Sequence, residues 1–393
     1  MSTQNLKNKN GRLLALIACL LVTFCMGTIH AFSTLIQNIE MQAGVGRMAS
    51  SFVYSTGLLN VTLAVFFGHV LYRKFSPNVL ITLIAILPII GLLFSNSGSW
   101  FGWIIGYGFL FGFSSGLGYG LSLYIVSSIT KDKKLGFALG LVTASYAFGA
   151  VVFSMLYPML FKHFGFENGY VMGLGILSCA TFVGLFLFIT SKVKINSLAN
   201  MSNKNSSIKP KILKLWTGYF LGVFSGLMII GHAVPLISSY GGSSIISVTA
   251  ITLMTLGSGI AGIYAGWLAD KFGCKRPLLT ILIVNSFSIF ILSITTSINL
   301  ILIFLILIAS IYGAVIAIYP TLVSHLVGNN LSAMVYGRVF TAWGAAGLLS
   351  PSIAGWLYEQ NNNYNSSILL TLIMSIAAAV SYTHLTLPTT RCV

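Results

Sequence analysis

Twelve apolar runs, each about as long as a membrane-spanning helix, follow one another along this 393-residue chain. A helix needs roughly 20 apolar residues, at about 1.5 Å rise each, to cross the hydrocarbon layer of a bilayer. The predicted spans are 13–36, 50–71, 79–96, 101–127, 135–160, 170–190, 215–237, 246–268, 277–295, 299–325, 339–357 and 366–380. The strands of a membrane barrel would alternate over about ten residues, a pattern not seen here. The runs predict an all-α polytopic membrane protein, with the last helix truncated.

The composition excludes several other classes of protein. Only 7% of the residues are charged, whereas a soluble domain carries about 25%. Five acids in the whole chain exclude EF-hands and carboxylate-pair hydrolases as first interpretations. The five cysteines form no CxxC motif and have no His at ligand spacing, which argues against zinc or a disulfide framework. We therefore expect no catalytic residue, no metal and no cofactor.

The positive charge of the chain is distributed as in a polytopic protein. The net charge is +16, but the Lys and Arg residues lie in short gaps between apolar runs instead of clustering on one polar face, which argues against nucleic acid. With the N-terminus in the cytoplasm, 19 of the 21 bases fall on the cytoplasmic side. The first apolar run lacks a small-residue cleavage site and is interpreted as a span, not a removed signal peptide. We expect a multi-pass plasma-membrane protein with a cytoplasmic N-terminus, present as a monomer in the lipid bilayer.

The chain divides into two similar halves. A Ser-, Asn- and Lys-rich stretch, 191–214, predicts a cytoplasmic linker between a six-helix bundle at 1–190 and another at 215–380. Matching residues recur 198 positions apart: Gly68 and Gly266, Thr143 and Thr341, Gly149 and Gly347. The halves are therefore predicted to be copies related by an axis along the membrane normal. The tail, 381–393, is expected to be non-native sequence, with a genuine polar tail as the alternative.

The segment 266–276, which joins spans eight and nine, reads GWLADKFGCKR. It resembles the G-x-L-x-D-[RK]-x-G-x-[RK]-[RK] loop of the major facilitator superfamily. The first-half copy, 68–75, is degraded and has Tyr72 where the family has an acid. The resemblance covers essentially the whole chain. It implies two pseudo-symmetric six-helix bundles around a midplane cavity that opens to one side of the membrane at a time.

Four further segments, 27–33, 131–140, 232–235 and 336–351, resemble the oxalate/formate antiporter and monocarboxylate-transporter branch of that superfamily. This likeness implies a small organic anion, such as a carboxylate, as the solute. Two bases common in the branch are replaced here, the span-eight Arg by Gly262 and the span-eleven Lys by Trp343. Because an unpaired buried charge costs several kcal/mol, these replacements weaken the inference of a carboxylate.

Polar side chains inside the spans are the candidates for substrate contact. No Asp or Glu lies near the middle of a predicted span, which argues against a carboxylate proton relay. A hydroxyl or indole N–H that faced lipid would lack a partner, so such groups should face a cavity or another helix. The predicted substrate-binding residues are His30, Tyr119, Tyr124, Tyr146, His232, Tyr312, Tyr319 and Trp343. The alternative for each is a structural bond to a neighbouring helix.

The resemblance also implies a conformational latch in the loop after span eight, placed against the start of span five. A carboxylate at a helix N-terminus is worth about 0.3–1 kcal/mol. The predicted latch residues are Gly266, Asp270, Lys271, Gly273 and Arg338. Arg338 occupies the pseudo-symmetric position, where its expected acid is Tyr72.

Together these features predict a secondary active or facilitative transporter that works by alternating access. Its solute is expected to be a small organic anion, moved by exchange or uniport. The alternatives are an exporter of amphipathic or drug-like compounds and, from other classes, a non-transporting membrane sensor or a membrane-embedded enzyme. A sensor would normally append a soluble signalling domain, and an enzyme would need a nucleophile–base pair or metal ligands at depth.

Overall fold

A computed structural model describes residues 9–130, 132–193 and 209–386. Within these ranges the chain forms helices and short turns, without a β-strand. Most of the predicted linker, 191–214, and the last residues of the predicted tail lie outside the described residues. The helical elements are α1 (Lys9–Gly27), η2 (Thr28–Thr34), α2 (Ile36–Ala43), α3 (Arg47–Lys74), α4 (Pro77–Ser95), α5 (Trp100–Trp103), η3 (Ile104–Phe111), α6 (Gly112–Ile129), η4 (Asp132–Lys134), α7 (Leu135–Phe164), α8 (Phe166–Thr190), α9 (Lys209–Ser239), α10 (Ser244–Phe272), α11 (Lys275–Ile294), α12 (Ile298–Val327), α13 (Asn329–Asn361) and α14 (Asn365–Thr386).

Every predicted span coincides with a long helical segment. In the part of the chain that the structure describes, eleven helices are long and apolar enough to cross a membrane. One further long helix, α13, coincides with the predicted span 339–357. It is not counted among these eleven helices. The fourth span is one continuous segment, Trp100–Ile129, made of α5, the π-helical η3 and α6. The all-α polytopic fold is confirmed.

The last helix is longer than the sequence analysis predicts. The predicted span ends near residue 380, whereas α14 continues to Thr386. The physical reason is that residues 365–386 contain no Gly or Pro, so the helical backbone hydrogen bonds continue through the polar residues that follow the apolar run. Tyr382, at 2% exposure, is buried. The helix thus ends six residues beyond the predicted end of the span, and the truncation of the native helix stays a prediction.

Local sequence signals set the helix ends. Ser76 accepts a hydrogen bond from the backbone N–H of Val79, and Pro77 follows in the first helical position of α4. Gly165 after α7 and Gly273 after α10 have φ of 77° and 76°, a region that favours glycine. These two glycines allow the sharp connections from α7 to α8 and from α10 to α11.

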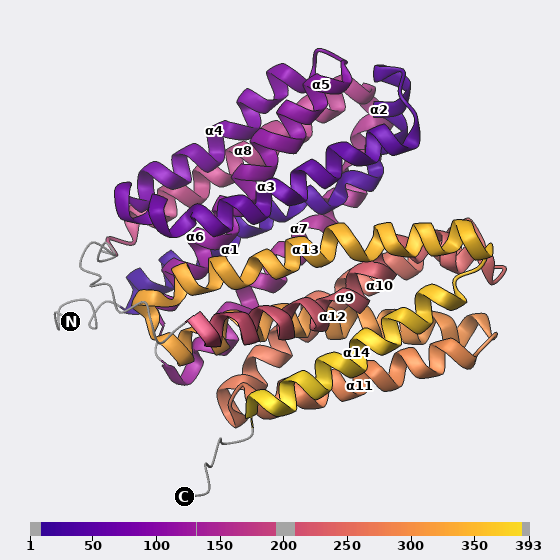
Figure 1. The fold of residues 1–393 in the computed structure, drawn as a ribbon. Coiled ribbons are helices and arrows are strands. Elements are labelled where there is room, and N and C mark those ends of the chain that lie inside the picture. Colours follow the sequence, from indigo (N-terminus) through magenta and orange to yellow (C-terminus); the bar gives the residue numbers. More distant parts are fainter. Residues whose placement is uncertain (1–8, 131, 194–208, 387–393) are drawn as a thin grey trace, which may run out of the picture. The chain divides into compact units, whose positions relative to one another are not determined.

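The contacts of the chain group into two compact units (Figure 1). The first unit comprises Met1–Lys131, Leu141–Ser202 and Val323–Gly337, and the second comprises Asp132–Gly140, Asn203–Leu322 and Arg338–Val393. In the first unit α3 packs on α6, α1 on α8 and α4 on α8; in the second, α11 packs on α14 and α14 on α9. Two short segments, at the starts of α7 and α13, thus group with helices from the other half of the sequence.

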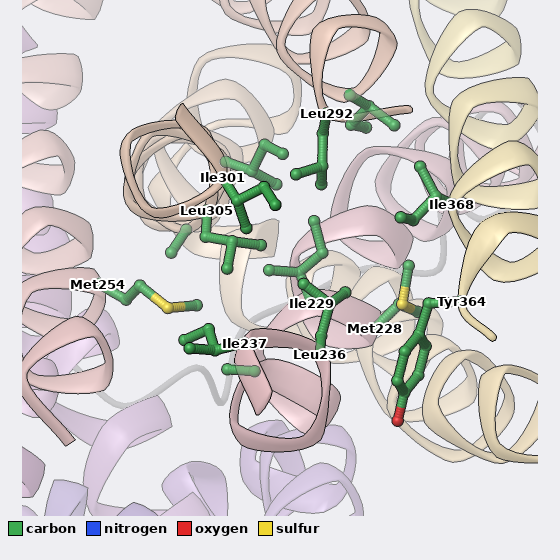
Figure 2. Packing of buried hydrophobic residues seen from close by; sticks show 14 of the residues in the cluster. Met228, Ile229, Leu236, Ile237, Met254, Leu292, Ile301, Leu305, Tyr364 and Ile368 are labelled. Atoms are coloured by element: carbon green, nitrogen blue, oxygen red, sulfur yellow. The ribbon is translucent and has the colours of Figure 1, made fainter. Parts of the chain in front are cut away.

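A group of buried side chains in the second unit forms an apolar cluster (Figure 2). It includes Met228 and Leu236 of α9, Leu305 of α12 and Ile368 of α14. Since lipid tails are as apolar as these side chains, helix association here depends on close packing instead of transfer from water. The cluster therefore holds α9, α12 and α14 together as a packed core.

Small residues bring helices of the first unit into backbone contact. A Cβ added at Gly27 would collide with the carbonyl oxygen of Tyr146, and one at Gly149 would collide with the carbonyl oxygen of Phe24. These positions allow α1 and α7 to cross without side chains between them, as small residues do in membrane helices. The crossing sets the position of the residues that follow Gly27.

Candidate functional site

The first transmembrane helix loses its α-helical form where His30 lies. α1 ends at Gly27, and the chain continues as the 3₁₀ helix η2, Thr28–Thr34, which carries His30. A change of helix type alters the direction of side chains and frees backbone groups. In transporters, interrupted helices of this kind build binding sites near the bilayer midplane. The sequence analysis did not predict this interruption.

Side chains from four elements meet around His30; we call His30, Tyr54, Ser115, Tyr119 and Tyr146 the imidazole–hydroxyl cluster. The Nδ1 atom of His30 lies 2.6 Å from the Tyr54 hydroxyl. The rings of His30 and Tyr146 meet edge to face at 5.5 Å, and those of Tyr119 and Tyr146 lie 5.1 Å apart. Three predicted site residues, His30, Tyr119 and Tyr146, are thus brought together.

Hydrogen bonds within the cluster have a definite direction at Ser115. Its hydroxyl donates to the carbonyl oxygen of Met26 at 2.8 Å, so it accepts from the Tyr146 hydroxyl at 2.7 Å. The Tyr119 hydroxyl lies 3.5 Å from both the Thr143 hydroxyl and the Tyr336 hydroxyl. The cluster contains no acid, and the imidazole of His30 is the one basic side chain in it.

The second unit holds a smaller polar pair, Trp343 of α13 and Tyr312 of α12. The indole N–H of Trp343 donates to the Tyr312 hydroxyl at 2.7 Å, and Phe340 stacks on the Trp343 ring at 5.1 Å. Gly226 of α9 leaves room for the Tyr312 side chain, which would collide with a Cβ there. Trp343 and Tyr312 supply polar groups without a formal charge.

The C-terminal end of α10 holds the start of α7 in the second unit. The Asp270 carboxylate accepts the backbone N–H of Gly136 at 2.6 Å and that of Phe137 at 2.8 Å. A Cβ at Gly136 or at Gly266 would collide with the carbonyl oxygen of the other residue, so the two backbones touch. Asp270 therefore satisfies N–H groups that a helix N-terminus leaves without an intrahelical partner.

A family profile described as the Major Facilitator Superfamily matches residues 18–249 and 215–391. The chain belongs to the Major Facilitator Superfamily. It is a multi-pass membrane carrier of small solutes and not an enzyme, because members of this family are non-enzymatic carriers. The resemblance inferred from the 266–276 loop is confirmed.

Curated relatives and a solved structure agree with this assignment. The oxalate:formate antiporter of Oxalobacter formigenes is 23% identical over 277 residues, which cover 68% of this chain and 66% of the antiporter. Monocarboxylate transporter 12 of Xenopus laevis is 20% identical over 388 residues, covering 90% of this chain and 84% of that transporter. The proton:xylose symporter XylE has a TM-score of 0.73 at 14% identity, with 95% of each chain covered, and shows the same fold.

Position 262 of the carrier, where relatives in the branch resembled by the sequence have an Arg, lies in a packed region. Gly262 of α10 is buried, and a Cβ added there would lie 3.5 Å from both the Ala317 Cβ and the Gly313 carbonyl oxygen of α12, which are ordinary contacts. A Cβ at Gly140 of α7 would meet the Gly262 carbonyl oxygen. Gly262, which stands where the branch has the span-eight Arg, is thus part of the close packing around α10. Trp343, which stands where the branch has the span-eleven Lys, is hydrogen-bonded to Tyr312.

The other predicted substrate residues of the carrier lie in separate contacts. His232 lies at a kink in α9, with φ of −115°. Its Nε2 is 2.8 Å from the Pro351 carbonyl oxygen. Tyr319 is 1% exposed and stacks on Tyr219 at 4.2 Å. Tyr124 stacks on Tyr72 at 5.3 Å. These three residues join neither the imidazole–hydroxyl cluster nor the Trp343–Tyr312 pair.

The predicted latch residues are similarly distributed. Gly266 and Asp270 contact the start of α7, and Gly273 ends α10. The Lys271 ammonium lies over the Trp267 and Phe272 rings. Arg338, at the start of the Arg338–Val393 segment of the second unit, is half-buried.

Several residues of the clusters were missed from the sequence. They are Tyr54, Ser115, Thr143 and Tyr336. Tyr54 is a polar-tipped aromatic within the predicted span 50–71, so the criterion that selected Tyr119 would also have selected it. Tyr336 lies just before a predicted span, and only its contact with Tyr119 relates it to the cluster.

Proposed function

We propose that this carrier moves small organic anions, carboxylates first, across the plasma membrane by alternating access. The observation that carries the proposal is the imidazole–hydroxyl cluster, in which His30 lies 2.6 Å from Tyr54 and no acid is present. The names of two relatives, an oxalate:formate antiporter and a monocarboxylate transporter, point to the same class of solute. The chain acts as a monomer, and its N-terminus is cytoplasmic because 19 of 21 bases then lie on that side.

A carboxylate in a region of low dielectric needs a positive charge or several hydrogen-bond donors. A bound anion would favour protonation of His30, which would then supply the charge, and the Tyr hydroxyls of the cluster can supply donors. The Trp343–Tyr312 pair adds neutral polar groups in the second unit. Because a single imidazole supplies at most one positive charge, the carrier should prefer singly charged anions to dicarboxylates.

The movement between states is proposed to use Asp270 as a latch. Its carboxylate holds two N–H groups at the start of α7, and α7 continues from the second unit into the first. Releasing these bonds exposes the N-terminus of α7 and removes the favourable interaction of the charge with the helix dipole. Gly266, Lys271, Gly273 and Arg338 are proposed to act with Asp270 in this movement.

Counterflow in liposomes tests the proposal. Purified carrier is reconstituted in vesicles loaded with unlabelled formate, lactate, oxalate or a neutral sugar, and uptake of the labelled solute is followed. We expect exchange of the monocarboxylates, weaker exchange of oxalate and none of the sugar. His30→Gln should reduce the exchange about tenfold or more, since bonds to a charged group are worth about 1.5–3 kcal/mol.

His69→Gln is the matched control. His69 lies in α3 with its Nδ1 3.0 Å from the Phe66 carbonyl oxygen, outside the cluster, so its replacement should leave exchange close to wild type. Exchange of neutral solutes without any carboxylate would refute the proposal. So would full carboxylate exchange by the His30→Gln carrier. Extrusion of an amphipathic dye, with no carboxylate exchange, would favour the exporter instead.

A further inference from the structure

One exposed face of α10 changes from apolar to aromatic to basic toward the end of the helix. Ile260 and Tyr264 are each 60% exposed, Trp267 is 41% exposed, and Lys271 is exposed. The spacing of four, three and four residues places all of them on one side of the helix. An exposed apolar face on a membrane-spanning helix contacts lipid, and Trp and Tyr at a helix end lie at the level of the headgroups.

The Lys271 ammonium has a defined position on this face. It lies 5.0 Å from the centre of the Trp267 ring and 5.2 Å from that of the Phe272 ring. Tyr264 stacks on Trp267 at 5.5 Å. The Trp267 ring therefore contacts Tyr264 on its N-terminal side along the helix and Lys271 on its C-terminal side. Cation–π contacts of this kind fix an ammonium while leaving its N–H groups able to donate.

Further bases lie near Lys271. Asp270 binds the backbone of α7 at Gly136 and Phe137, and η4, just before them, contacts α10. Both carboxylate oxygens of Asp270 are thus engaged by N–H groups. By sequence, segments 131–136 and 270–276 together carry six bases and two acids. The exposed bases among them are Lys133, Lys134, Lys271, Lys275 and Arg276.

We infer that the headgroup of an anionic phospholipid binds where η4 meets the α10–α11 turn, with its phosphate held by Lys271, Lys275 and Arg276. Charge complementarity favours an anion, since the bases outnumber the acids. The exposed Trp267, Tyr264 and Ile260 continue from the bases toward the hydrocarbon, which fits an attached acyl chain and not a free phosphate ion. Basic clusters beside membrane helices attract anionic lipids by about 1 kcal/mol per base.

The chain contains a matched comparison in α3. Leu63, Phe67 and Val70 are exposed at the same spacing and lead to an exposed Lys74. That face has bases at its end but no Tyr–Trp pair. Arg73→Ala with Lys74→Ala therefore controls for general electrostatic attraction between the carrier and a charged membrane.

The test measures lipid retained by the full-length carrier. Carrier in nanodiscs of phosphatidylcholine with a minority of phosphatidylglycerol is released for native mass spectrometry, and bound phosphatidylglycerol is titrated. Removing Lys271, Lys275 and Arg276 by alanine substitution should weaken phosphatidylglycerol binding about fivefold for each base removed. Trp267→Leu should weaken it less, and phosphatidylcholine binding should not change.

Three results would overturn the inference. The first is unchanged phosphatidylglycerol binding by the triple variant, and the second is an equal loss in the Arg73→Ala, Lys74→Ala control. The third is displacement of the lipid by inorganic phosphate as effectively as by phosphatidylglycerol, which would show a site for free anions. If the triple variant fails to fold, judged by size exclusion and helical content, Trp267→Leu and the single Arg276→Ala decide in its place.

Discussion

At the scale of single residues, the two histidines of the membrane region differ in their partners. His30 lies among hydroxyls, whereas the ring nitrogens of His232 contact Pro351 of α13 and Tyr364 of the turn before α14. A carbonyl oxygen only accepts, so the Nε2 of His232 donates to Pro351, and Nδ1 accepts from the Tyr364 hydroxyl at 3.2 Å. Burial, with the neighbouring Tyr358, raises the pKa of Tyr364, which keeps this hydroxyl protonated as a donor.

His232→Ala should therefore reduce stability more than it reduces solute recognition. Two hydrogen bonds between helices are lost, worth about 0.6 kcal/mol each by membrane-protein averages. We expect a lower Tm in a fixed detergent, with roughly half the effect for Tyr364→Phe. His163→Ala, at an exposed site, is the control and should leave Tm unchanged. An unchanged Tm with loss of transport in His232→Ala would show direct contact with the solute.

Sequence reasoning identified residue types at this scale better than it identified their contacts. Among the polar-tipped aromatics inside the spans, Tyr146 and Trp343 do find polar partners. Which partner each one finds depends on how helices cross, and that is not encoded in a local window of sequence. For this reason Tyr319, which is stacked on Tyr219 and buried, could not be distinguished from Tyr119 in advance.

At the scale of helices, the apolar runs gave the number and order of spans, while interruptions inside the spans were missed. The 3₁₀ helix η2 and the π-helical η3 contain no proline, so no local signal marks them. Close helix approach was partly predictable from glycine, but the repeat is misleading here. Gly149 and Gly347 are equivalent by sequence, yet a Cβ at Gly149 would collide with the Phe24 carbonyl oxygen, and one at Gly347 would meet nothing within 4 Å.

Alanine substitution at these two equivalent glycines should have opposite effects. Gly149→Ala forces α1 and α7 apart, and overpacking of this kind costs about 1–3 kcal/mol. Gly347→Ala adds a methyl group to open space within α13, where Ala is favoured over Gly by up to about 1 kcal/mol. Thermal unfolding of both variants in one detergent measures the difference. A lower Tm in both, by the same amount, would contradict the asymmetry between the repeats.

At the scale of the whole molecule, the contact units do not follow the division of the sequence into halves. Asp132–Gly140, at the start of α7, groups with the second unit, and Val323–Gly337, which includes the start of α13, groups with the first. The two segments are held differently. Asp270 uses a carboxylate to bind α7, whereas Gly337 packs on the backbone of Val65 and Phe66. The carrier is thus predicted to have a charged latch at the start of α7 that is sensitive to neutralisation of Asp270.

Neutralising this latch by Asp270→Asn tests the prediction. The substitution removes a charge worth about 0.3–1 kcal/mol at the N-terminus of α7, so the described state should become less populated.

Cys274 reports the change, because burial and then the charge of Asp270 raise the pKa of its thiol to about 12, which makes maleimide labelling slow near neutral pH. With Cys19, Cys25, Cys179 and Cys392 replaced by Ser, labelling is followed across pH. A lower thiol pKa alone raises the labelling rate without changing counterflow, whereas release of α10 changes both. Faster labelling with unchanged counterflow would mean that Asp270 only balances charge.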